Sequence, residues 1–118
     1  NEIWRSTLDL LDFTPLSNVD YSGGIIITDW FSESSDQDPV KISVRFLSSQ
    51  IRADGLKVII YKKIIKKIDD KNNCKTIKDN TTLGSEIKLA ILKKAAIIYS
   101  SEIPKHQKNY TESGVDND

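Results

Sequence analysis

The sequence predicts an α+β fold in which an antiparallel three- to four-stranded sheet is covered by two helices, in a helix-grip-like arrangement. Three patterns predict it: helical spacing at the start of the chain, strand alternation in the middle, and a second helical pattern near the end. Because strands joined by short links pair antiparallel, the helices must cover the apolar face of the sheet. A chain of 118 residues can bury such a core, so we expect one domain over residues 1–104 and a disordered tail over 105–118.

Residues 2–13 carry apolar side chains at helical spacing, and Pro15 prevents the helix from continuing. A loop rich in turn residues then leads through Gly23 and Gly24 to the first strand. Residues 25–31 are β-branched or aromatic except for Asp29, which predicts this strand. The polar stretch that follows, residues 32–39, is expected to be a loop.

Residues 40–46 alternate between apolar and polar side chains, as a strand with one buried face does. We expect a reversal within 48–55, with Gly55 at positive φ, and a long antiparallel strand over 56–68. The lysine-rich segment 62–67 would gather its lysines on one side as a helix. The β-rich residues before it favour a strand that runs past the sheet. Residues 69–73 are expected to be a turn, and 74–78 a short fourth strand.

The last element is a helix that begins at Leu83, capped by Thr81 or Thr82, and closes at Pro104. Its period places Lys88 and Lys93 on the solvent side. The expected inner side comprises Leu83, Ile87, Ala90, Ile91, Lys94 and Ile98.

Charge is balanced over the chain, with 17 basic and 17 acidic residues, but it is unevenly distributed. Residues 1–40 carry a net charge of −7, residues 41–108 carry +10, and residues 109–118 carry −3. Arginine is scarce, and Tyr61 is the aromatic residue nearest to the lysine-rich segment. Because nucleic-acid sites combine basic residues with arginine or aromatic readers, we expect no nucleic-acid partner.

No pattern typical of catalysis, a metal site or a cofactor is present. His106 and Cys74 are single residues of their kind, so neither a zinc site nor a His-based triad is expected. Asp29 and Asp54 are best interpreted as turn or capping residues. The longest apolar run is residues 25–27, far shorter than the roughly 20 residues that cross a bilayer.

Trp30 and Phe31 occupy adjacent positions at the end of the first strand, so their side chains must point to opposite faces of the sheet. One of them belongs to the core. The other lies on the second face, where it either anchors a partner or packs under the 32–39 loop.

Several segments resemble a family of small alphaproteobacterial envelope proteins with no assigned function, many of which look like secreted lipoproteins. The resemblance covers roughly residues 2–100. It is carried by residues 3–16, Asp20, Gly23-Gly24, the 26–32 segment around Thr28-Asp29-Trp30, and Arg52-Ala53-Asp54-Gly55-Leu56. The order of elements is also similar to the helix-grip modules of the C-type lipoprotein of the outer-membrane β-barrel assembly machine, a likeness of fold alone.

The resemblance implies a periplasmic, outer-membrane-associated protein. The chain begins at Asn1 and contains no methionine, so we expect that a segment before it was removed: a signal peptide, a lipoprotein leader or only an initiator methionine. Of these, the resemblance implies a lipoprotein leader with its acylated cysteine. Membrane contact would then occur only through that lipid anchor.

Our leading hypothesis is a non-enzymatic module that binds another envelope protein, with an oligomeric state left open. The candidate partner-binding residues are Asp29, Trp30, Phe31, Arg52 and Asp54. The alternative is a carrier of a small apolar ligand such as a lipid, which would need a cavity between the sheet and the C-terminal helix.

Overall fold

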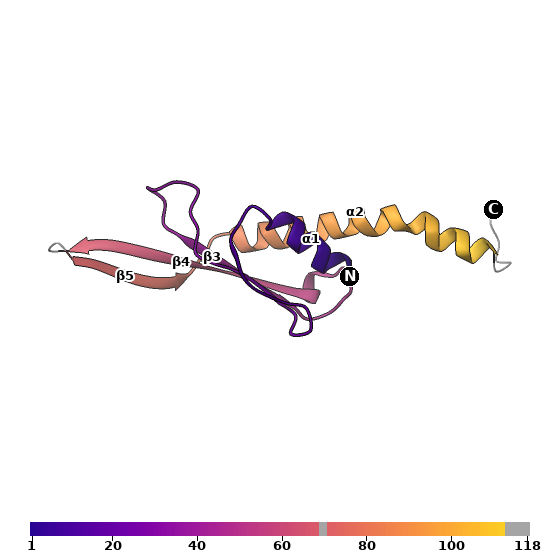
Figure 1. The fold of residues 1–118 in the computed structure, drawn as a ribbon, viewed down its shortest axis with the longest axis horizontal. Coiled ribbons are helices and arrows are strands. Elements are labelled where there is room, and N and C mark those ends of the chain that lie inside the picture. The colour runs from indigo at the N-terminus through magenta and orange to yellow at the C-terminus, as the bar shows by residue number, and fades with distance from the viewer. Residues whose placement is uncertain (69–70, 113–118) are drawn as a thin grey trace.

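A computed structural model describes residues 1–68 and 71–112. Its five strands form one sheet in the order β1-β2-β3-β4-β5, with every neighbouring pair antiparallel. Helices α1 and α2 lie together on one side of this sheet (Figure 1), which confirms the predicted α+β class. The elements are α1 (Glu2–Leu10), β1 (Leu16–Asp20), β2 (Ile25–Thr28), β3 (Val40–Phe46), the 3-10 turn η1 (Ala53–Gly55), β4 (Leu56–Ile68), β5 (Lys71–Lys78) and α2 (Leu83–Glu112).

The sheet has one strand more than the three to four predicted, because β1 lies in the segment that was expected to be a loop. All five residues of β1 are exposed, and Asn18 and Asp20 are typical turn residues, so no apolar alternation marks the strand. Its position depends instead on pairing with β2 and on the Asp29 N–H, which donates to the Pro15 carbonyl at 2.6 Å. Such an edge strand is defined by its neighbour more than by its own sequence.

The other strands match the prediction more closely. β3 and β4 have the predicted bounds, and β5 begins at Lys71, earlier than the expected residue 74. The regular part of β2 ends at Thr28, and Phe31 then forms an isolated bridge with Val40. The turn expected over residues 69–73 is corrected at 71–73, which belong to β5, while residues 69 and 70 lie outside the described ranges.

Two details of the turns and helix ends differ from the sequence prediction. Among the described glycines, positive φ occurs at Gly24, at 68°, and not at Gly55. At Gly55 the constraint is space, because a Cβ atom there would lie 2.8 Å from the Gln50 carbonyl oxygen. The hydroxyl that accepts from the first backbone N–H of α2 belongs to Thr81, at 3.3 Å from Leu83 N.

Helix α2 does not end at Pro104 as predicted, since it continues to Glu112. A proline inside a helix removes one backbone hydrogen bond, here the one to the Ser100 carbonyl, without necessarily stopping the helix. The tail expected to be disordered is therefore helical up to residue 112, and residues 113–118 lie outside the described part. The domain boundary at residue 104 stays a prediction.

The core fills the layer between the sheet and the two helices. The predicted apolar side of α1 packs into this layer. Ile91 and Ala95 of α2 also point into it, whereas Ala90, which was expected on the inner side of the helix, is exposed. Thr28 extends the β2–β3 contact, because its hydroxyl accepts the Ile42 N–H at 2.9 Å. The buried apolar side chains are Ile3, Leu11, Ile26, Ile42, Val44, Leu56, Ile60, Ile91 and Ala95.

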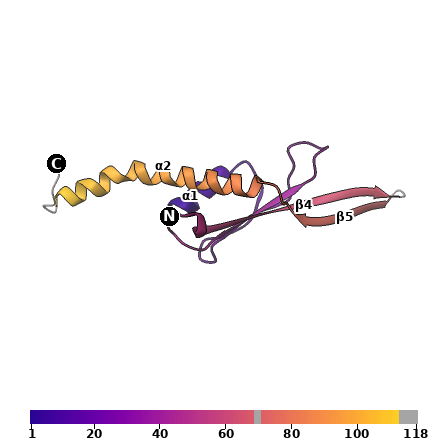
Figure 2. The ribbon, with the colours of Figure 1, turned by 180° about the vertical axis from the view of Figure 1, so that it is seen from behind.

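The molecule is elongated, measuring 76 × 25 × 23 Å. β4 extends beyond β3, so its last residues have strand partners in β5, from Lys63 opposite Thr76 to Ile68 opposite Lys71, and the Lys63 N–H also donates to the Pro39 carbonyl at 3.0 Å. We call this two-stranded extension, residues 63–68 and 71–76, the ribbon arm. Figures 1 and 2 show the arm at one end of the molecule and the C-terminal part of α2 at the other.

Candidate functional site

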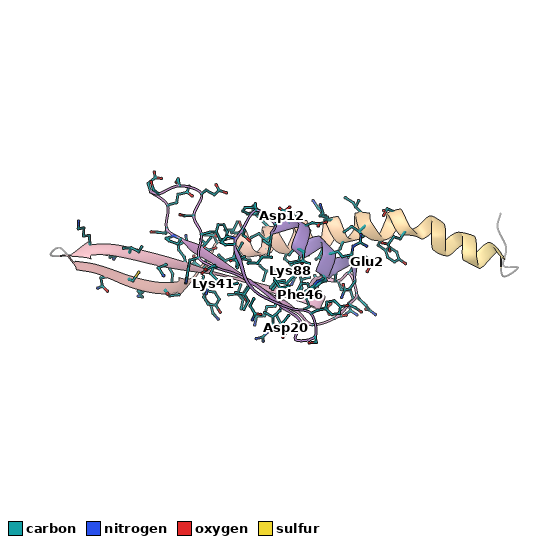
Figure 3. All side chains as sticks on the ribbon, viewed as in Figure 1. Glu2, Asp12, Asp20, Lys41, Phe46 and Lys88 are labelled. Atoms are coloured by element: carbon teal, nitrogen blue, oxygen red, sulfur yellow. The ribbon has the colours of Figure 1, made fainter. Side chains whose placement is uncertain are left out.

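Neither of the two described helices covers the second face of the sheet (Figure 1), and we call it the open face. Cross-strand pairing aligns Ile27, Ser43 and Ile59 on this face, opposite in direction to the buried Ile26, Val44 and Ile60. These side chains are only half-buried, and so is Tyr61. Figure 3 shows the contrast between the two sides, with Asp12 on the side of the helices and Asp20 on the opposite side. The open face of β2, β3 and β4 is therefore partly exposed to solvent, as one face of an antiparallel sheet often is.

Trp30 lies at one end of the open face, next to two lysines. The Lys63 Nζ atom lies 4.6 Å from the centroid of the Trp30 ring, and the Lys41 Nζ atom lies 5.3 Å from it. Both distances are within the range of a cation–π interaction. The lysines therefore hold the indole ring in place while it stays partly accessible to solvent.

Phe31 points to the other side and packs against the core. Its ring forms an edge-to-face pair with Phe13, with centroids 5.9 Å apart. The prediction that one aromatic of the pair belongs to the core and the other to the second face is confirmed. Whether Trp30 anchors a partner stays a prediction.

The five predicted partner-binding residues do not form one site. Asp29 stays beside Trp30, and its carboxylate accepts the Trp30 N–H at 2.8 Å. Arg52 and Asp54 form an exposed bidentate pair, at 3.0 and 2.7 Å, at the turn between β3 and β4. The two groups lie at opposite ends of β3, whose length from residue 40 to residue 46 corresponds to about 20 Å.

The open face is strongly basic. Cross-strand register places six cationic side chains on it, and none of them is in an ion pair among the described residues: Lys41, Arg45, Lys57, Lys63, Lys67 and Lys78. The same register places the carboxylate of Asp20 at the β1 edge. That carboxylate already accepts from Ser22 and from the Gly23 N–H, and these hydrogen bonds hold its pKa below the ordinary value.

Sequence reasoning missed this basic face because it counted charge in blocks along the chain. In strands, neighbouring lysines point in opposite directions, so only the register shows which of them share a face. The neighbouring residues Lys62 and Lys63 illustrate this. Lys62 pairs with the buried carboxylate of Asp79 at 3.4 Å on the helix side, whereas Lys63 contacts Trp30 on the open face.

Two hollows beside α2, both lined by described residues, bear on the lipid-carrier hypothesis. A cavity of about 220 Å³ opens beside the start of α2, between Phe31, Ile87 and the 32–39 loop. A second depression, about 480 Å³, lies between the turn after β3 and α2 near Tyr99, outside the sheet. Pockets for small molecules usually measure roughly 300–1,000 Å³, so the cavity beside Phe31 is smaller than that range, whereas the depression near Tyr99 is within it but does not lie between the sheet and α2. The lipid-carrier hypothesis, which needs a cavity between the sheet and α2, stays a prediction.

Other features of the described residues carry no site. No group of three or more His, Cys, Asp or Glu side chains gathers there in a way that could hold a metal ion. Cys74 is exposed on the ribbon arm, and the side chain of His106 lies outside the description. In the described part of the chain, no helix combines the length and apolar character needed to cross a membrane.

Comparisons with known proteins relate the chain to a family whose function is not known. A model for a domain of unknown function, DUF3576, matches residues 1–99. The chain is 32% identical over 103 residues to the uncharacterized protein RP420 of Rickettsia prowazekii (strain Madrid E). This aligned region covers 86% of this chain and 59% of that protein. The chain thus spans somewhat more than half the length of this relative. No solved structure matches. From the match over residues 1–99, the chain belongs to the DUF3576 family.

Proposed function

We propose that this chain is a non-enzymatic module that binds a partner protein on the open face around Trp30. The observation that carries the proposal is the contrast between the two faces of one sheet. Two helices bury one face, while the other leaves Ile27, Ile59 and Tyr61 half-buried beside an indole ring. Tryptophan and tyrosine supply much of the binding energy at protein interfaces, because a large flat ring excludes water around it.

We further propose that the module works in the bacterial envelope, as a periplasmic lipoprotein domain associated with the outer membrane. The support is the resemblance of its Thr28-Asp29-Trp30 and Arg52-Ala53-Asp54-Gly55 segments to envelope proteins. Fractionation of cells that produce the natural full-length protein tests this location. Recovery with the outer membrane supports it, and recovery in the cytoplasmic fraction contradicts it.

The binding proposal is tested by photo-cross-linking in those cells, with a photoreactive residue at Ser43 on the open face or at Leu89 on the outer side of α2. Ser43 should form a discrete adduct with a partner protein, and Leu89 should not. Introducing Trp30→Ala into the Ser43 protein should reduce the adduct by about tenfold or more, as the loss of a central aromatic anchor does.

Leu89→Ala is the matched control, because it removes an exposed large side chain from another surface. Phe31→Ala is unsuitable, since Phe31 packs against the core. If the folded Trp30→Ala protein forms the Ser43 adduct as well as the wild type does, the proposal is wrong.

A further inference from the structure

We propose that the partner presents an extended acidic segment, which lies along β4 on the open face and binds its row of lysines. This inference rests on the proposed function and names the chemistry of the partner at the same surface. It is carried by three features of the described residues: the spacing of the cations, their lack of carboxylate partners, and the apolar side chains between them.

The spacing of side chains along one face of β4 matches that of an extended peptide. Alternate residues of a strand lie about 6.6 Å apart on one face, so Lys57 and Lys67 mark a track of about 33 Å. Ile59, Tyr61, Lys63 and Ile65 lie between them on the same face. A peptide in β conformation has the same period, so over about ten residues one of its faces can place carboxylates opposite Lys57, Lys63 and Lys67 and other side chains opposite the apolar residues between them.

Neighbouring strands widen the track. Lys41 on β3 lies directly opposite Tyr61, and Lys78 on β5 lies opposite Tyr61 from the other side. Arg45 is opposite Lys57. Adjacent strands are about 4.8 Å apart, so these cations flank the track within reach of the same acidic segment.

Within residues 1–68 and 71–112, these cations have no carboxylate partner. The chain's three ion pairs among the described residues are Arg5–Glu102, Arg52–Asp54 and Lys62–Asp79, and none involves a cation of the open face. Much of its own acidity lies elsewhere, as on α1 and in the 32–39 loop, where Glu33 and Asp38 line the cavity beside Phe31. The positive charges of the open face therefore favour an external partner that is rich in carboxylates, because charge complementarity promotes association.

A protein segment fits this face better than a single-stranded nucleic acid. Nucleobases bind by stacking on free aromatic rings, often with arginine beside them. Here the cations of the face are lysines except for Arg45, which lies opposite Lys57 and not beside Trp30. The isoleucines between the lysines provide contacts for aliphatic side chains, which a peptide has and a phosphate backbone lacks.

Fluorescence anisotropy with a labelled ten-residue peptide that alternates Glu and Thr tests the inference. The peptide should bind, its Gln-for-Glu version should bind about tenfold more weakly, and raising the salt concentration should weaken binding of the Glu peptide. Lys63→Gln and Lys67→Gln should each weaken binding about two- to fivefold, in line with exposed charge pairs. Lys93→Gln, on the exposed side of α2, is the matched control and should change nothing.

Four outcomes would overturn the inference: equal binding of the Glu and Gln peptides, an equal loss in Lys93→Gln, tighter binding of a ten-nucleotide oligothymidylate, or tighter binding of anionic phospholipid vesicles. The failure of this inference is distinguishable from failure of the proposed function. If Trp30→Ala removes the Ser43 adduct while excess Glu peptide does not compete with it, the acidic segment is wrong and the protein-binding function stands. If Trp30→Ala leaves the adduct intact, the binding function fails whatever the peptide does.

Discussion

The two faces of the sheet use the same strands in opposite ways. On the covered face, apolar side chains are excluded from water, and buried hydroxyl groups are satisfied: Ser6 donates to the Ile91 carbonyl at 2.7 Å and Thr7 donates to the Ile3 carbonyl at 2.8 Å. On the open face, isoleucines stay half-exposed, and the cations lack carboxylate partners in the part of the chain that the structure describes. Alternation along a strand therefore lets one segment stabilise the fold with one set of residues and leaves the other set for the proposed partner, and substitutions on the two faces should separate these effects.

The largest contrast is expected between isoleucines on opposite faces. Ile91→Ala, at a fully buried position of α2, should lower the free energy of unfolding by about 2–5 kcal/mol, because it leaves a cavity in the core. Ile59→Ala on the open face should lower it by roughly 1 kcal/mol or less, since water already reaches that side chain. Urea denaturation followed by tryptophan fluorescence measures both, and similar losses would show that the open face is part of the core.

A smaller contrast is expected between the two neighbouring aromatics. Phe31→Ala removes a ring that packs against the core and against Phe13, and should cost about 2 kcal/mol of stability. Trp30→Ala removes cation–π contacts to two lysines, which contribute roughly 0.5–1 kcal/mol at exposed sites. Thermal unfolding by circular dichroism distinguishes them. An equal or larger loss in Trp30→Ala would mean that Trp30 serves the fold and would weaken its role as an anchor.

The difference between these positions also explains what the sequence could predict. β3 and β4 were predicted with their observed bounds because apolar alternation marks a strand with one buried face. β1 was missed because its residues are all exposed and its structure depends on β2. The basic open face was missed for a related reason: it is assembled by register between β3, β4 and β5, which no local pattern contains.

A hydroxyl pair provides the next comparison. Ser6 is fully buried between α1 and α2, and its hydroxyl bonds to a carbonyl of the other helix, so Ser6→Ala should cost about 1 kcal/mol of stability. Ser43 lies on the open face without a side-chain hydrogen bond in the described structure, and Ser43→Ala should change stability by only a few tenths of a kcal/mol. Chemical denaturation of both variants checks this. A neutral Ser6→Ala would show that packing alone joins the two helices.

The smallest effect concerns Lys62 and Lys63, neighbours on opposite faces. The side chain of Asp79 is only 4% exposed and lies beside Lys62. A hydrogen bond from the Thr81 hydroxyl and, to a smaller extent, the nearby Lys62 lower the pKa of its carboxyl below the ordinary 3.8. Because the folded-state pKa is lower than the unfolded one, the ionised carboxylate stabilises the fold above about pH 4, and this contribution is lost as the pH falls through the folded-state pKa.

Asp79→Asn should therefore be less stable than the wild type at neutral pH, and the difference should shrink between about pH 4 and lower values. Urea denaturation at a series of pH values measures it, with Lys63→Gln as the control on the open face. Lys63 has no carboxylate partner among the described residues, so its substitution should leave the acid dependence of stability unchanged while weakening the binding of acidic peptide. If Lys63→Gln instead removes the same acid-dependent stability as Asp79→Asn, the two faces are coupled. The idea that one face of the sheet stabilises the fold while the other binds the proposed partner would then be wrong.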